Sequence, residues 1–242
     1  MLRSILRGMI NRSPTLFTMR HRMAMLPATM GGSQKAAQRS WSQHGEDERL
    51  IVELKDVLRT GYYVDIGANH PAVLSNTYRL YCMGMRGICV EPNALLCGLH
   101  ERYRWGDVIL SAAVGAEDGL LPFYEMSYHA FSTFSEADYK RYIEGGKMTL
   151  VRQSLKPMFR LATILKSCAP ADKSFELLSV DVEGLDEMVL RSNDWSKWRP
   201  RFVLAEGNTE EAAKGTGGYL REIGYEQVGT FGVNALYRNS SV

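Results

Sequence analysis

The stretch Tyr62-Tyr63-Val64-Asp65-Ile66-Gly67-Ala68-Asn69 decides the fold, because a mostly apolar run carries an acid next to its end and a glycine directly after it. A second apolar run, Gly87 to Val90, ends on Glu91. In an open parallel sheet, ligands bind outside the carboxyl ends of the strands. There the first loop approaches a nucleotide, and the next strand presents an acid to the ribose hydroxyls. The two strand ends therefore predict a nucleoside site, with Gly67 in the loop and Glu91 at the ribose.

The loop after the first strand departs from the dinucleotide-binding fingerprint. That fingerprint requires glycine at three places, and the equivalent residues here are Gly67, Asn69 and Ala72. Two of the three positions fail, which argues against NAD or FAD. The loop favours a nucleoside ligand without a pyrophosphate, such as S-adenosylmethionine.

Strands and helices alternate along the chain. Helical spacing of apolar residues predicts helices before the first strand and between the strands. The alternation is typical of a doubly wound α/β fold. Strands are predicted at Tyr62 to Ile66, Arg86 to Val90, Val108 to Val114, Phe175 to Val180 and Arg201 to Ala205, with a closing antiparallel pair at Glu226 to Val228 and Val233 to Tyr237.

The segment after the third strand is the least regular. Leu120 to Tyr124 is expected to form a strand that returns along the third. From Met126 to Lys156 we expect a loop rich in aromatic residues and a short helix carrying Tyr139, Tyr142 and Ile143. Two interpretations stay open: the loop covers a substrate, or its aromatic residues pack the loop onto the sheet.

The chain has 242 residues, of which 45% are hydrophobic and 23% charged, values that are ordinary for a globular protein. Residues 1–45 hold seven basic and no acidic side chains, whereas the remainder holds 22 basic and 27 acidic ones. We expect one folded domain over residues 40–242, preceded by a basic, flexible extension over residues 1–39. Such an extension fits an organellar transit peptide, an arm that contacts a membrane surface or an anionic polymer, or an unstructured tail.

The four cysteines, Cys82, Cys89, Cys97 and Cys168, include no closely spaced pair and no histidine at zinc-finger spacing. They predict reduced thiols in a cytoplasmic protein and no structural metal site. No apolar stretch in the basic extension is long enough to span a bilayer. We expect no specific nucleic-acid partner.

Several motifs occur in a fixed order: Ser42-Gln43-His44-Gly45-Glu46-Asp47, Tyr63 to Pro71, Ser75-Asn76-Thr77, Glu91-Pro92-Asn93, Ala113-Val114-Gly115 and Asp181-Val182-Glu183-Gly184. Their order and spacing resemble the FkbM-type methyltransferase family. The resemblance covers about two thirds of the chain. It implies a Rossmann-like class I methyltransferase fold, with a mostly parallel seven-stranded sheet, helices on both faces and a C-terminal antiparallel strand. It also implies S-adenosylmethionine as methyl donor and O-methylation of a sugar, glycan or natural-product hydroxyl. The predicted donor-binding residues are Asp65, Gly67, Ala68, Asn69 and Glu91.

Three residues are candidates for catalysis. Asp181 ends the fourth main strand and is the first choice for a base or for an acceptor-orienting group; capping of the next helix would explain it equally. Glu183 is explained either by catalysis or by the dipole of that helix, and a further interpretation couples both acids to a divalent cation. His70 has a side chain that titrates near neutral pH, but it also suits a hydrogen bond within its own loop.

Our interpretation is an S-adenosylmethionine-dependent methyltransferase acting on a small-molecule or glycan acceptor. An alternative is a Rossmann-like module without catalysis that binds a partner or a membrane surface through its basic arm. A nicotinamide oxidoreductase is a third hypothesis, which the missing glycines disfavour.

Overall fold

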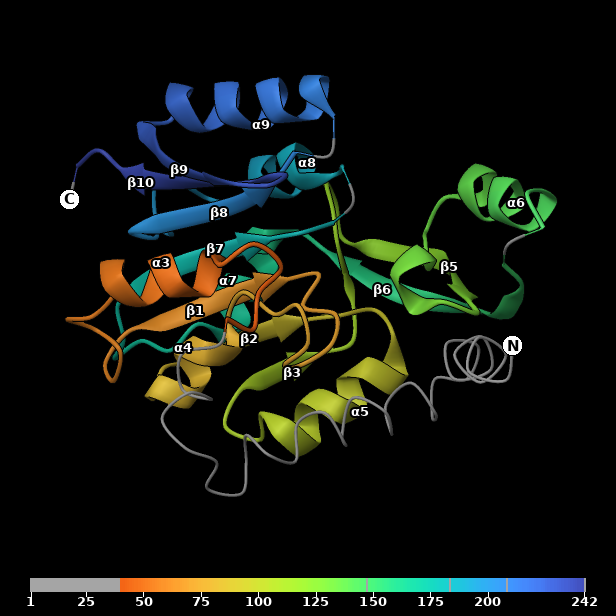
Figure 1. The fold of residues 1–242 in the computed structure, drawn as a ribbon, viewed down its shortest axis with the longest axis horizontal. Helices are drawn as coiled ribbons and strands as arrows, with labels where there is room; N and C mark the ends of the chain where they lie inside the picture. Colours follow the sequence, from red (N-terminus) through yellow and green to blue (C-terminus); the bar gives the residue numbers. More distant parts are fainter. Residues whose placement is uncertain (1–39, 147, 183, 208, 242) are drawn as a thin grey trace, which may run out of the picture. The chain divides into compact units, whose positions relative to one another are not determined.

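The computed structural model describes residues 40–146, 148–182, 184–207 and 209–241 (Figure 1). Residues 1–39, for which the sequence predicts a basic extension, lie outside the described residues. The described chain forms two compact units. One comprises residues 40–120 and 157–241, and the other comprises residues 121–156.

The larger unit contains a seven-stranded sheet with the order β3-β2-β1-β7-β8-β10-β9. Neighbouring strands from β3 to β8 are parallel, and β10 is antiparallel to both β8 and β9. The predicted seven-stranded, mostly parallel sheet with an antiparallel C-terminal strand is therefore confirmed (Figure 1). The strands are β1 (Tyr62–Ile66), β2 (Arg86–Val90), β3 (Val108–Leu110), β7 (Phe175–Val180), β8 (Phe202–Glu206), β9 (Tyr225–Phe231) and β10 (Asn234–Asn239).

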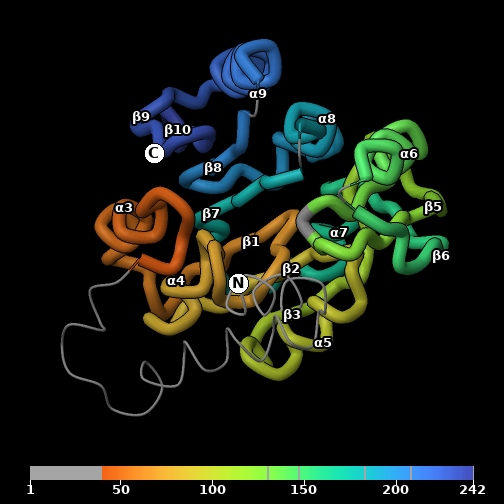
Figure 2. The backbone as a smooth tube through the Cα atoms, turned by 45° about the vertical axis from the view of Figure 1, so that its right-hand side comes forward, coloured from red at the N-terminus to blue at the C-terminus, as the bar shows by residue number. Residues whose placement is uncertain are grey.

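Helices cover both faces of this sheet (Figure 2). Alternate residues of a strand point to opposite faces, so Val64 and Tyr63 of β1 enter different cores. One core includes residues of α7 (Leu161–Cys168), α8 (Asp186–Arg191) and α9 (Glu210–Glu222). The other includes residues of α3 (Glu46–Glu53) and α4 (Tyr78–Met83). Because both faces are covered, every residue of β1 is buried.

The third strand begins at Val108 as predicted but is shorter than the predicted range of Val108 to Val114. β3 ends at Leu110, where a tight turn has the Ala112 N–H donating to the Leu110 carbonyl at 3.1 Å. The chain then leaves the large sheet, and β4 (Ala113–Val114) pairs with β6 (Leu150–Phe159). The predicted strand at Leu120 belongs to β5 (Gly119–Met126), which joins a three-stranded sheet of order β4-β6-β5 instead of returning along β3. Strand β6 was not predicted, because its many polar residues obscure the alternation of a half-buried strand.

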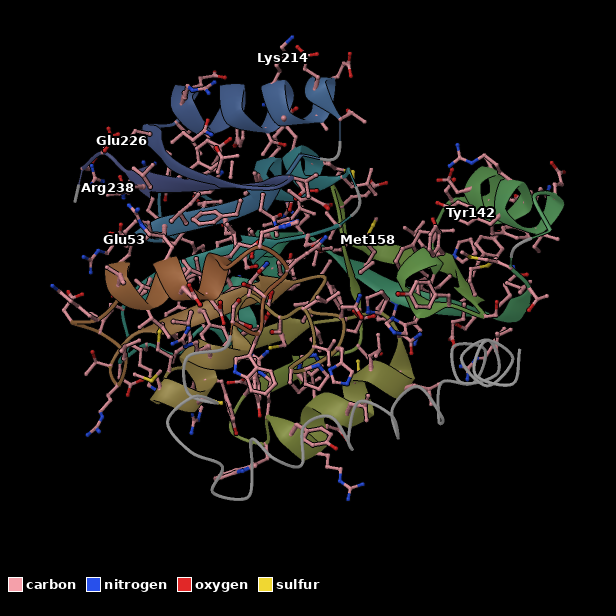
Figure 3. All side chains as sticks on the ribbon, in the orientation of Figure 1. Glu53, Tyr142, Met158, Lys214, Glu226 and Arg238 are labelled. Carbon is pink, nitrogen blue, oxygen red and sulfur yellow. The ribbon has the colours of Figure 1, made fainter. Side chains whose placement is uncertain are left out.

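Aromatic side chains pack against one another within residues 121–156. The Tyr124 and Tyr139 rings stack with centroids 4.0 Å apart, and the Phe131 and Tyr142 rings meet edge to face at 5.3 Å. The predicted short helix is α6 (Glu136–Glu144), which carries Tyr142 (Figure 3). These contacts account for the aromatic residues as internal packing of the unit. A role in covering a substrate stays a prediction.

Two further helices connect these elements: α5 (Ala94–Tyr103) between β2 and β3, and the short 3-10 helix η2 (His129–Phe131) before α6. Within the described part of the chain, no helix is long and apolar enough to cross a membrane.

Candidate donor-binding and catalytic site

The loop after β1 is held between the ends of the two neighbouring strands. The N–H groups of Gly67 and Ala68 donate to the Val90 carbonyl of β2 at 3.0 and 3.1 Å. On the other side, Gly67 has a φ of 77°, and a Cβ there would lie 1.9 Å from the Asp181 carbonyl oxygen. Only glycine fits this position, because a side chain would collide with the backbone at the end of β7. The Ala68 side chain is itself buried in the sheet's core.

Glu91 ties the end of β2 to this loop. Its Oε2 accepts the Asn69 N–H at 2.9 Å, and its Oε1 accepts the Asn93 N–H at 2.7 Å. The side chain is buried, with 7% exposure. A carboxylate has about four acceptor positions, and a contact between Glu91 and ribose hydroxyls stays a prediction. The bond to Asn93 shows that Glu91 also caps the turn at Pro92.

Asn69 is the most constrained residue of the loop. It adopts a left-handed backbone with φ of 46°, and its carbonyl lies 2.9 Å from the Nε2 atom of His100 on α5. Its Oδ1 atom is buried and has no hydrogen-bond partner among the described residues. Burial and the nearby Arg104 lower the pKa of His100 to about 3, so the ring is neutral and Nε2 is the donor. His100 was missed from the sequence because nothing in helix α5 marks it as a partner of the loop.

Asp65 lies beneath the loop and is 5% exposed. Its Oδ2 atom accepts the Thr77 hydroxyl and lies 3.8 Å from Nη1 of Arg104. Burial raises the pKa of Asp65 above its ordinary value, although Arg104 and the hydroxyl groups of Thr77 and Ser179 act in the opposite direction. In this structure the carboxylate is engaged by side chains of the protein, and a direct donor contact stays a prediction.

Asp181 lies beside the donor loop at the end of β7. Its N–H donates to the Ile66 carbonyl at 3.0 Å, and its side chain is half-buried. The following helix α8 has Leu185 as its N-cap residue and no side-chain cap. Helix capping therefore does not explain Asp181. Glu183, the second catalytic candidate in this turn, lies outside the described residues.

His70 is 4% exposed and serves its own loop. Its Nδ1 atom accepts the N–H groups of Ala72 and Val73 at 3.1 and 3.0 Å. An imidazole nitrogen that accepts two N–H bonds carries no proton, so the proton of the neutral ring resides on Nε2. This arrangement favours the structural interpretation of His70 over the catalytic one.

Asp186 is an acid in this region that no sequence pattern singled out. It is 1% exposed, and its Oδ1 accepts the Glu206 N–H of β8 at 3.0 Å. Its Oδ2 atom has no hydrogen-bond partner within the described ranges. Burial, with a contribution from the negative charge of Asp181, raises the pKa of Asp186 to about 7.

Among the residues that the structure describes, no group of three or more His, Cys, Asp or Glu side chains could hold a metal ion. The divalent cation considered for Asp181 and Glu183 stays a prediction, since Glu183 lies outside the described ranges.

Comparison with known protein families identifies the family to which the chain belongs. The family model described as the Methyltransferase FkbM domain matches residues 65–226, which span the donor loop, Glu91 and Asp181. The match covers well over half of the chain. The chain therefore belongs to the FkbM methyltransferase family, and the resemblance noted in the sequence is confirmed.

Two solved structures show similar chain traces. The methyltransferase FkbM from Methylobacillus flagellatus is 13% identical, with a TM-score of 0.47, over 75% of this chain and 44% of that one. A TehB-like SAM-dependent methyltransferase from Corynebacterium glutamicum is 8% identical, with a TM-score of 0.41, over 94% of this chain and 100% of that one. The chain thus spans less than half the length of the Methylobacillus protein. No curated protein sequence matches significantly.

Proposed function

We propose that the protein transfers a methyl group from S-adenosylmethionine to a hydroxyl oxygen of a sugar, glycan or natural product. One observation carries the proposal: the buried carboxylate of Glu91 is bonded to the Asn69 N–H of the loop after β1, and Asp181 adjoins that same loop. The acid proposed to bind ribose and the acid proposed for the acceptor side thus both adjoin one loop at the carboxyl edge of the sheet. Membership of the FkbM family supports methyl transfer and this donor.

The residues of the loop fit a nucleoside donor. The carboxylate of Glu91 is buried beside the loop and accepts the Asn69 N–H, and the buried Oδ1 of Asn69 has no hydrogen-bond partner among the described residues. Glu91 would hold the ribose, and Asn69 would present an acceptor to the donor's polar groups. The loop lacks the glycines that let a backbone close around a pyrophosphate, which agrees with a donor that has none.

Bound S-adenosylmethionine supplies an electrophilic methyl group on a sulfonium. The protein has to orient the acceptor oxygen in line with that methyl group and remove the hydroxyl proton as the oxygen attacks. Asp181 is the proposed group for the second task, because it adjoins Gly67 and helix capping does not account for it. Glu183 remains a candidate for the same task, and His70 is assigned to support of the loop.

A transfer assay tests this proposal. The purified chain is incubated with S-adenosylmethionine carrying a trideuterated methyl group and with panels of hydroxylated acceptors, and products are analysed by mass spectrometry. The proposal expects the labelled methyl group on an acceptor oxygen and a much weaker signal for Asp181→Asn. Donor binding without transfer to any hydroxylated acceptor would contradict O-methylation. Failure to bind the donor would favour the alternative, a Rossmann-like binding module without catalysis.

We also propose that residues 1–39 form an arm that contacts anionic surfaces. The basis is compositional, since this segment carries no acidic side chain. Sedimentation of the full chain with anionic vesicles, compared with a chain lacking residues 1–38, tests the arm. Equal binding by both chains would contradict it.

A further inference from the structure

Arg104, at the end of α5, is a fully buried cation close to the donor loop. Its exposed fraction is 0%, which is uncommon for arginine unless its charge is compensated. Its Nε lies 2.8 Å from Asp107, and its Nη2 donates to the Tyr63 hydroxyl at 2.7 Å and to the Thr77 hydroxyl oxygen at 2.9 Å. The guanidinium is therefore fixed by groups from β1, from the start of α4 and from the loop before β3.

The same guanidinium contacts Asp65. Nη1 of Arg104 lies 3.8 Å from Oδ2 of Asp65 and makes no hydrogen bond with any described residue. Thr77 links the two groups a second time, because its hydroxyl accepts from Arg104 and donates to Asp65. Asp65 stands two residues before Gly67, so this pair lies at the base of the donor loop.

A buried carboxylate needs such a partner. Without a compensating charge, Asp65 would take up a proton instead of remaining an anion in the core. Burial already raises the pKa of Asp65, and Arg104 is the largest influence that lowers it. Asp107 cannot substitute for Arg104, because a carboxyl group offers no positive charge; its oxygens accept the Tyr63 hydroxyl and the Gly87 N–H.

We propose that Arg104 is a positioning residue for the donor site, which keeps Asp65 ionised and fixed beneath the loop from Gly67 to Asn69. The inference rests on the proposed function, because it assigns a donor to that loop. Loss of the guanidinium would leave Asp65 protonated near neutral pH. The Thr77 hydroxyl would then face a carboxylic acid instead of an anion, and the end of β1 would lose its anchor to α4 and α5.

The pH dependence of Asp65 follows from the groups that surround it. Among the described residues around it, Arg104 lowers the pKa of Asp65 and Asp107 raises it. Desolvation raises the pKa values of Tyr63 and Cys89 well above their usual range. The groups facing Asp65 from neighbouring elements are Arg104 of α5, Thr77 before α4, Asp107 before β3, Ser179 of β7, Tyr63 of β1 and Cys89 of β2.

Titration with S-adenosylhomocysteine across pH tests the inference. Calorimetry compares the wild type, Arg104→Met and Arg104→Lys between about pH 6 and pH 9, after circular dichroism has shown that each is folded. The wild type is expected to bind equally across this range. Arg104→Met is expected to bind roughly tenfold more weakly, or worse, near pH 6 and to recover as the pH rises and Asp65 loses its proton. Arg104→Lys, which keeps the charge, is expected to restore most of the affinity.

Arg199→Met is a matched control. Arg199 donates to the Ile223 carbonyl at 2.7 Å and lies over the Tyr225 ring, away from the donor loop. Loss of the Arg199 side chain should lower the stability of the fold, but the affinity for S-adenosylhomocysteine should stay independent of pH. If Arg104→Met does not fold, Arg104→Gln, which keeps a polar side chain but removes the charge, takes its place with the same expectation.

A loss of affinity that is the same at every pH would overturn the positioning role and leave Arg104 a packing residue. The carboxyl carbon resonance of Asp65 gives a second readout that needs no donor. It should report an ionised group in the wild type and a protonated one in Arg104→Met at neutral pH. An ionised Asp65 in both proteins would overturn the inference even if the donor binds. A wild type that binds no S-adenosylhomocysteine would instead overturn the proposed function.

Discussion

The Oε2 atom of Glu91 accepts the backbone N–H of Asn69 at 2.9 Å. This hydrogen bond connects the end of β2 to the loop that follows β1. The acid proposed to bind ribose thus also holds the loop against which the donor would lie. Removal of the Glu91 side chain is therefore expected to affect both the proposed ribose contact and the position of the loop.

Glu91→Ala should weaken binding of S-adenosylhomocysteine by on the order of 1.5 to 3 kcal/mol, because ribose hydrogen bonds and the loop anchor are lost together. Calorimetric titration of the folded variant measures the change. The control is Glu226→Ala, which breaks an exposed ion pair with Arg238 on the β9 and β10 hairpin (Figure 3) and should leave donor affinity intact. Wild-type affinity in Glu91→Ala would remove the ribose assignment.

Asp181→Asn should preserve donor affinity and slow methyl transfer by roughly a hundredfold or more, because the amide cannot accept the hydroxyl proton. Single-turnover transfer rates, measured with saturating donor, separate the chemical step from binding. An unchanged rate would show that another group, such as Glu183, removes the proton.

Gly67→Ala should destabilise the fold by roughly 2 kcal/mol or more. The added Cβ meets the Asp181 carbonyl oxygen, and the left-handed backbone disfavours any side chain. Gly98→Ala is the matched control, because Gly98 lies within α5 and a Cβ added there would meet nothing within 4 Å. That change should stabilise the protein by roughly 0.5 to 1 kcal/mol through better helix propensity. Urea unfolding of both variants measures the difference, and equal effects would contradict the close approach of β1 and β7.

Asp186→Asn should raise stability at alkaline pH relative to the wild type. The folded pKa of about 7 lies above the ordinary aspartate value, so the folded state binds more protons than the unfolded state between about pH 4 and pH 7. Wild-type stability therefore falls as the pH rises through this window. The amide keeps an oxygen for the Glu206 N–H and carries no charge, so the variant should gain on the order of 2 to 4 kcal/mol at pH 8 relative to the wild type. Unfolding at about pH 4 and pH 8 checks this, and a difference independent of pH would refute it.

The sequence predicted the features that depend on local patterns. Buried strands such as β1 and β7 are apolar except for one or two residues, and they were predicted at the bounds that the structure shows. The closing antiparallel pair was also predicted, and it corresponds to β9 and β10. β6 was missed because its residues are mostly exposed or half-buried, which leaves no clear apolar pattern. Its partner β5 was consequently paired with the wrong strand.

The same limit applies to the site. Glu91 stood out because an acid ends an apolar strand. Arg104 and His100 did not, because Arg104 reaches Asp65, and His100 reaches the Asn69 carbonyl, only through the tertiary fold. The capping alternative for Asp181 was likewise resolved by the position at which α8 begins.

The most direct test of the account is an isothermal titration of the purified chain with S-adenosylhomocysteine, run beside NADH at equal concentration. The account predicts binding of S-adenosylhomocysteine in the micromolar range and no binding of NADH. Binding of neither ligand, or of NADH alone, would contradict the assignment of the loop from Gly67 to Asn69 and Glu91 as a methyl-donor site.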